Sequence, residues 1–116
     1  HRIFARQGDD LLVRVPVSFA QAALGATIEV PTLDGTAKLT IPRGTRSGQT
    51  FRIKGKGIPR LNSLGRGDLI VQTEIEVPKK LTKEQAELLK RFDELEQKRS
   101  GKKSLIDRIK DLAKGS

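Results

Sequence analysis

Apolar and polar residues alternate along the first two thirds of the chain. In the clearest run, Leu11, Val13, Val15 and Val17 would point to one side of a strand while polar residues face the other. The same alternation recurs at residues 28–30, 37–41, 51–53 and 69–77. Strands with one apolar and one polar face are typical of an antiparallel sheet that buries one side.

Turn-forming residues separate these predicted strands. Asp34-Gly35 lies between two alternating runs and is a strong hairpin signal. Residues 55–67 are rich in Gly and Pro, which predicts a long loop. Residues 19–24 interrupt the β pattern as a short helix, with Ser18 as its N-cap and Gly25 as its terminator.

After Pro78 the pattern becomes helical. Thr82 and Gln85 form a capping-box pair that begins an amphipathic helix reaching about Lys98. A second, shorter helix is expected after Ser104, and at this length it is marginal alone. The apolar stripes of the two helices consist of Leu88, Leu89, Phe92, Leu95, Leu105, Ile106, Ile109 and Leu112. These stripes either pack on the chain's own sheet or, as we expect, pair with a second copy in a two-fold symmetric dimer.

These patterns predict a mainly β fold with two parts. Residues 1–78 are expected to form a small antiparallel β-sandwich-like domain with one short helix. Residues 79–116 are expected to follow it as C-terminal amphipathic helices that serve as a dimerisation tail.

The amino-acid composition excludes several common kinds of catalytic site. The chain has no Cys, and its one His is residue 1, so neither a thiolate zinc site nor a His-based triad is available. We therefore expect a protein that is not an enzyme and that needs no metal or cofactor. No apolar run approaches the ~20 residues of a membrane helix, and we expect a cytoplasmic protein. Because the chain lacks an initiator Met and opens on a strand-like pattern, it is interpreted as a piece of a longer protein.

The net charge of +9 raises a nucleic-acid hypothesis, because clustered Lys and Arg bind phosphate. Residues 1–78 carry a net charge of +4 and residues 79–116 carry +5, so the tail is the more basic part. Acidic residues are interleaved along that tail, and the chain has four Phe but no Tyr or Trp to stack on bases. A solvated helical surface explains the charge better, and a basic nucleic-acid-binding domain stays the alternative.

Several segments resemble one family in sequence order. The opening residues 1–11, HRIFARQGDDL, resemble the H-P-x-F-x-R-x-G-x-D-L segment of DnaJ-type J-domain co-chaperones. Further matching segments follow in the family's order: AALG at 22–25, VPTLDG at 30–35, IP-x-GT at 41–45, GKGIP at 55–59, GDLIV at 67–71 and the helix from Leu81 to Leu89. Arg2 replaces the family's usual Pro, and Arg46 stands where Gln is common.

The resemblance implies the second C-terminal β domain of such a co-chaperone, followed by its dimerisation region. It implies binding of unfolded or partly folded polypeptides, a homodimer formed through the C-terminal helices, and delivery of clients to a DnaK-type chaperone through upstream regions. A role in protein folding and the stress response is expected, with no membrane and no nucleic acid among the partners.

Similarity between the family's paired β domains places the client groove where the strand before the short helix meets the strand after it. This nominates Val13, Val15, Ile28 and Val30 as client-binding residues. The alternative is that all four are core. Leu12 and Ile70, apolar residues on otherwise polar faces, are a second candidate for an adhesive surface.

Overall fold

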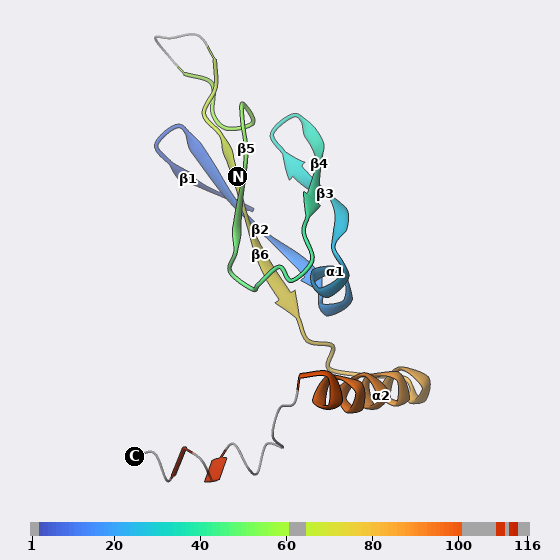
Figure 1. The fold of residues 1–116 in the computed structure, drawn as a ribbon. Coiled ribbons are helices and arrows are strands. Elements are labelled where there is room, and N and C mark those ends of the chain that lie inside the picture. The colour runs from blue at the N-terminus through green and yellow to red at the C-terminus, as the bar shows by residue number, and fades with distance from the viewer. Residues whose placement is uncertain (1–2, 61–64, 101–108, 111, 114–116) are drawn as a thin grey trace. The chain divides into compact units, whose positions relative to one another are not determined.

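A computed structural model describes residues 3–60, 65–100, 109–110 and 112–113. The chain divides into two compact units, His1–Val77 and Pro78–Ser116 (Figure 1). Among the described residues, the first unit contains six strands and a short helix, and the second contains a longer helix. The expected fold class, mainly β with one short helix before a helical C-terminal part, is confirmed.

Four strands of the first unit form one sheet. They are β1 (Phe4–Gln7), β2 (Asp10–Ser18), β5 (Thr50–Ile53) and β6 (Leu69–Glu76), in the order β1-β2-β6-β5. The central pair β2–β6 is parallel, with Leu11 opposite Leu69, and the two outer pairs are antiparallel. The expected antiparallel pairing is found in the two outer pairs, and the central pair differs from it, because alternation reports which face is buried and not the direction of the neighbouring strand.

The remaining two strands form a separate hairpin. β3 (Ala26–Thr32) pairs with β4 (Gly35–Ile41) in an antiparallel ladder that ends with Thr32 opposite Gly35. Leu33 and Asp34 are therefore the two loop residues, and Gly35 opens β4 with φ 141°, a backbone conformation that favours glycine. The hairpin predicted from Asp34-Gly35 is confirmed.

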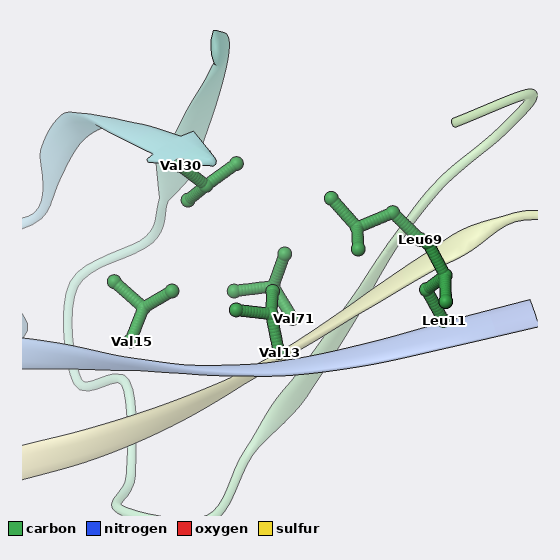
Figure 2. Packing of buried hydrophobic residues seen from close by; sticks show 6 residues of the cluster. All are labelled: Leu11, Val13, Val15, Val30, Leu69 and Val71. Carbon is green, nitrogen blue, oxygen red and sulfur yellow. The ribbon is translucent and has the colours of Figure 1, made fainter. Parts of the chain in front are cut away.

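The core lies between this hairpin and the four-stranded sheet. Val13, Val15 and Val71 of the sheet face Val30 of β3, as Figure 2 shows. A second cluster, formed by Val17, Ala22 and Ile41, continues the core toward the short helix. Nine apolar residues are buried in the part of the chain that the structure describes, and the predicted inward faces of β2 and β6 supply six of them: Leu11, Val13, Val15, Val17, Leu69 and Val71.

The short helix α1 (Phe19–Leu24) begins with the predicted cap. The Gln21 amide N–H donates to Ser18 Oγ at 3.0 Å, and the Ser18 N–H donates to Gln21 Oε1 at 3.1 Å. Gly25 ends the helix at φ 82°, and a Cβ added there would lie 3.2 Å from the backbone nitrogen of Arg43. Both the backbone angle and the close approach explain why glycine stands at this position.

The second unit contains α2 (Lys83–Ser100). Thr82 and Gln85 form the predicted capping box, with reciprocal hydrogen bonds of 3.1 and 3.0 Å. Residues 109–110 and 112–113 are helical, and the rest of the predicted second helix, including Leu105 and Ile106, lies outside the described residues. No helix among the described residues is long and apolar enough to cross a membrane.

One strand ends earlier than its sequence pattern predicts. Val77 continues the alternation of β6, but the strand ends at Glu76 and the Val77 side chain is 85% exposed. Pro78 follows directly and has no amide hydrogen for a ladder, so the pairing stops before it.

Candidate functional site

The four residues predicted to bind a client lie together in the core. Val13 and Val15 come from β2, and Ile28 and Val30 come from β3. Val13 is 2% exposed and Val30 is fully buried, and Ile28 is half-buried between the two core clusters. The structure therefore brings them together at the junction between hairpin and sheet, where their side chains are covered. Their role in binding stays a prediction.

An apolar row crosses the opposite, outer face of the four-stranded sheet. Leu12 lies directly between Ala5 on β1 and Ile70 on β6 in the strand register. Directly opposed residues share one face of a sheet, so these three side chains lie side by side, away from the core. Leu12 and Ile70 are only half-buried, and they are the two residues that the sequence singles out as apolar on polar faces.

A hollow of about 410 Å³ adjoins this row at the β1 side of the sheet. Ile3, Phe4, Ala5, Leu12 and Arg14 line it. Four of these five residues are apolar, but the surface they present is about half polar, and the Arg14 guanidinium lies at its border. Arg14 also reaches Glu74 at 3.9 Å, a solvent-exposed ion pair that contributes little to stability.

A hydrogen-bonded charge cluster borders the other end of the row. Arg52 lies opposite Ile70 and donates from Nη1 to Asp68 at 2.9 Å and to Asp10 at 3.3 Å. The Gly55 N–H donates to Asp68 Oδ1 at 3.0 Å. This amide, followed by the Arg52 guanidinium, lowers the pKa of Asp68 below its ordinary value, and the two carboxylates raise the pKa of Arg52.

The outer edge of β1 is open within the described part of the chain. β1 is the first strand in the sheet order and pairs on one side only, with β2. Such an edge presents backbone N–H and C=O groups that an extended polypeptide can pair with. The hollow and the apolar row lie next to this edge, so backbone pairing and apolar side-chain contacts are available together.

The predicted dimerisation residues of α2 are solvent-exposed. Leu88 is 64% exposed and Leu95 is 48% exposed, and Leu89 and Phe92 are exposed to a similar degree. Ile109 and Leu112 are also exposed, and Leu105 and Ile106 lie outside the described residues. The exposed apolar side chains of α2 are thus accessible to another molecule. Dimerisation stays a prediction.

The match to a family model decides which family this is. Residues 1–78 match the model of the DnaJ C-terminal domain. The matched range includes the apolar row and the core. The chain belongs to the DnaJ C-terminal domain family. This DnaJ-family region covers both sheets and α1 and ends where the second unit begins.

Curated DnaJ proteins match nearly the whole chain. The chaperone protein DnaJ of Ruminiclostridium cellulolyticum is 50% identical over 116 residues, which is 98% of this chain and 31% of that protein. The corresponding proteins of Caldicellulosiruptor saccharolyticus and Neisseria gonorrhoeae are 51% and 47% identical over 96% and 97% of this chain. The chain spans about a third of the length of these relatives.

Sequence reasoning missed part of the DnaJ-family surface. Ile3, Ala5 and Arg14 line the hollow, but no pairing partner was predicted for the opening segment. The sequence contains a signal that would have found this partner. Gly8 and Asp9 form a two-residue turn between Gln7 and Asp10, and a hairpin with this turn places Ala5 opposite Leu12. Among the described residues, no group of three His, Cys, Asp or Glu side chains could hold a metal ion.

Proposed function

We propose that this chain is the polypeptide-holding and dimer-forming part of a cytoplasmic J-domain co-chaperone. It holds segments of non-native polypeptide without chemistry of its own, and the parent protein passes these clients to a DnaK-type chaperone. In this proposal, residues 1–78 form the holding domain and residues 79–116 form the dimerisation tail. The relatives named chaperone protein DnaJ support the assignment.

The observation that carries the holding function is the apolar row beside an open strand edge. Leu12 and Ile70 remain partly exposed on a face that is otherwise polar, and a hollow lies next to Leu12. An unfolded segment lying along β1 gains backbone hydrogen bonds there, while its apolar side chains bury against the row and the hollow. Backbone pairing does not depend on sequence, so this geometry suits a partner without a defined sequence.

The exposed stripe of α2 supports the dimer. Four large apolar side chains on one helix face a single side at helical spacing: Leu88, Leu89, Phe92 and Leu95. A second copy offers the same stripe, so a two-fold contact buries both at once. Two holding domains in one particle would grip two segments of the same client, which raises the effective concentration of the second contact.

A binding measurement tests the holding function. We expect fluorescently labelled, reduced and carboxymethylated α-lactalbumin, a permanently unfolded chain, to bind the 116-residue protein. The double substitution Leu12→Ser/Ile70→Ser should weaken that binding at least five-fold, because it removes the apolar row. The matched control Leu24→Ser removes a leucine that is 72% exposed on α1, away from the row, and should leave the affinity unchanged.

A salt series separates this function from nucleic-acid binding. The affinity for the unfolded chain should fall less steeply with salt than the affinity for single-stranded DNA, because apolar burial and backbone pairing add to the attraction between the basic protein and the anionic probe. Steeply salt-dependent binding to single-stranded DNA, with no affinity for the unfolded chain, would support the basic nucleic-acid-binding alternative instead.

A further inference from the structure

The outer face of β2 carries a different kind of side chain at each of its first three positions. Alternate residues of a strand share one face, and on the outer face of β2 these are Asp10, Leu12 and Arg14 in sequence order. An acidic, an apolar and a basic side chain thus follow one another at two-residue intervals. All three lie one strand in from the open edge of β1, the first strand of the sheet (Figure 1). A segment that pairs with this edge therefore meets charges as well as the apolar row.

The two charged side chains on this face differ in their partners. Both carboxylate oxygens of Asp10 are used: Oδ1 accepts the Asp68 N–H at 2.7 Å, and Oδ2 accepts from Arg52 at 3.3 Å. Within the described residues, the Arg14 side chain has a single ion pair, in which Nε lies 3.9 Å from Glu74, beyond hydrogen-bonding distance. The side chain of Arg14 is also 68% exposed. The Arg14 guanidinium is therefore able to bind an anionic group that arrives from solvent, whereas Asp10 is already occupied.

Arg14 lines the same hollow as Ala5 and Leu12. Ala5 lies opposite Leu12, and its side chain is a single methyl group, so it leaves space for a larger side chain beside it. Arg14 comes two residues after Leu12 on the same face, a step of about 7 Å along the strand. The guanidinium is thus one two-residue step away from the apolar part of the hollow.

The strand register determines which side chains of an added segment reach these groups. The residue that pairs opposite Ala5 shares its face, so its side chain enters the hollow. The side chains two positions before and two positions after it lie on the same face, one level with Asp10 and the other level with Arg14. The residues directly before and after it point to the other face of the sheet. An acidic side chain therefore approaches Arg14 only at the two-residue spacing.

We propose that Arg14 makes this edge selective among non-native polypeptides, favouring extended segments in which an acidic residue lies two positions from an apolar residue. The apolar side chain fills the hollow beside Ala5 and Leu12, and the carboxylate pairs with the guanidinium. This inference rests on the proposed holding function and adds to it a rule for which segments are held. Backbone pairing accepts any segment, so the preference comes from the side chains.

Two labelled peptides of identical composition test the spacing. The alternating peptide is Gly-Ser-Thr-Glu-Thr-Leu-Thr-Glu-Thr-Ser-Gly, in which an acid reaches the level of Arg14 whichever way the segment runs. The shifted peptide is Gly-Ser-Thr-Thr-Glu-Leu-Glu-Thr-Thr-Ser-Gly, whose acids face the other side when its Leu fills the hollow. Both ends are blocked and both peptides carry the same charge, so the general attraction to a protein of net charge +9 is equal for the two.

The readout is the loss of affinity that each peptide suffers when Arg14 is replaced, measured by fluorescence anisotropy. Arg14→Gln should weaken binding of the alternating peptide about three-fold, the size expected of one partly exposed ion pair, and leave the shifted peptide unchanged. Comparing losses rather than absolute affinities removes any contribution from Arg6, which the shifted acids can approach on the other face. The matched control is Arg43→Gln, which removes the same charge from an exposed arginine after β4 and should affect both peptides equally.

The possible results separate this selectivity from the holding function. An equal loss for the two peptides, or no loss for either, would overturn the selectivity. So would the absence of binding by both peptides while carboxymethylated α-lactalbumin still binds through Leu12 and Ile70, and the holding function would then stand. If neither the peptides nor α-lactalbumin bound to the unsubstituted protein, the holding function and the selectivity would both fail.

Discussion

Asp68 connects three parts of the β domain through one carboxylate. It accepts hydrogen bonds from the Gly55 N–H and from Arg52, and its own backbone N–H donates to Asp10 Oδ1 at 2.7 Å. β5, the loop after it and the start of β6 are thereby joined at one end of the sheet. An ionised Asp68 accepts the hydrogen bonds from Gly55 and Arg52 better than a protonated one, because a carboxylate accepts more strongly than a carboxylic acid.

The lowered pKa of Asp68 predicts an acid-dependent loss of stability. Because the folded-state pKa lies below the unfolded value near 3.8, the ionised group stabilises the fold above that pH, and the effect is lost as the pH falls through the folded pKa. Asp68→Asn should therefore lower the free energy of unfolding at pH 7 and flatten its pH dependence below about pH 4. Urea unfolding at a series of pH values measures this.

The matched control for that series is Glu76→Gln, an exposed carboxylate at the end of β6. It should reproduce the pH dependence of the unsubstituted protein. A pH dependence that is the same for Asp68→Asn and for the unsubstituted protein would contradict the assignment.

At the scale of an element, the loop from Gly55 to Gly67 depends on close backbone contacts. A Cβ added at Gly67 would lie 2.0 Å from the Asp9 carbonyl oxygen, and one at Gly57 would lie 2.6 Å from the same atom. These are backbone atoms of a turn between two strands and cannot move aside as a flexible side chain would. The two glycines therefore seat the loop against the β1–β2 turn, which in turn positions Arg66 for its contact with Asp34.

Gly67→Ala should destabilise the protein by about 2–3 kcal/mol, the usual cost of forcing extra volume into a packed site. Gly8→Ala is the matched comparison, since Gly8 has φ 64° but open space around its Cβ position. That substitution should cost only about 1 kcal/mol from backbone strain. Chemical denaturation gives both values, and equal effects would show that the close approach does not matter.

Across the whole molecule, the exposed stripe of α2 predicts association between chains. The double substitution Leu88→Gln/Leu95→Gln keeps good helix formers in place and removes two apolar side chains. We expect the dimer dissociation constant to rise more than ten-fold, because those side chains lose their burial in the interface. Sedimentation at several concentrations measures this.

The control for association is Lys90→Gln, which introduces the same residue on the opposite face of α2. It should leave the dimer unchanged. Unaltered sedimentation of the Leu88→Gln/Leu95→Gln variant would place any interface outside this stripe.

The elements that the sequence predicted best are those determined by neighbouring residues. Both helix starts follow from capping residues, Ser18 for α1 and Thr82 with Gln85 for α2, and the hairpin follows from a two-residue turn. The buried faces of β2 and β6 follow from alternation. Such signals act over a few residues, so a short window of sequence contains all the information they need.

The parts that could not be predicted depend on distant residues. The parallel pairing of β2 with β6 results from the path of all the intervening chain, which no local pattern reports. The same holds for the candidate site: Leu12 and Ile70 were recognisable one by one, but their direct opposition, and the hollow beside them, require the register of three strands. Burial of Val13, Val15 and Val30 likewise depends on where the hairpin docks.

The parallel pair at the centre of the sheet also has a consequence for how the protein is made. Leu11 finds its neighbour Leu69 only 58 positions later in the chain, so β2 cannot acquire its central partner until β6 has left the ribosome. Contacts of such sequence separation slow folding and leave apolar strands uncovered in the meantime. During its own synthesis, this domain therefore exposes the kind of apolar strand that we propose it binds in other unfolded chains.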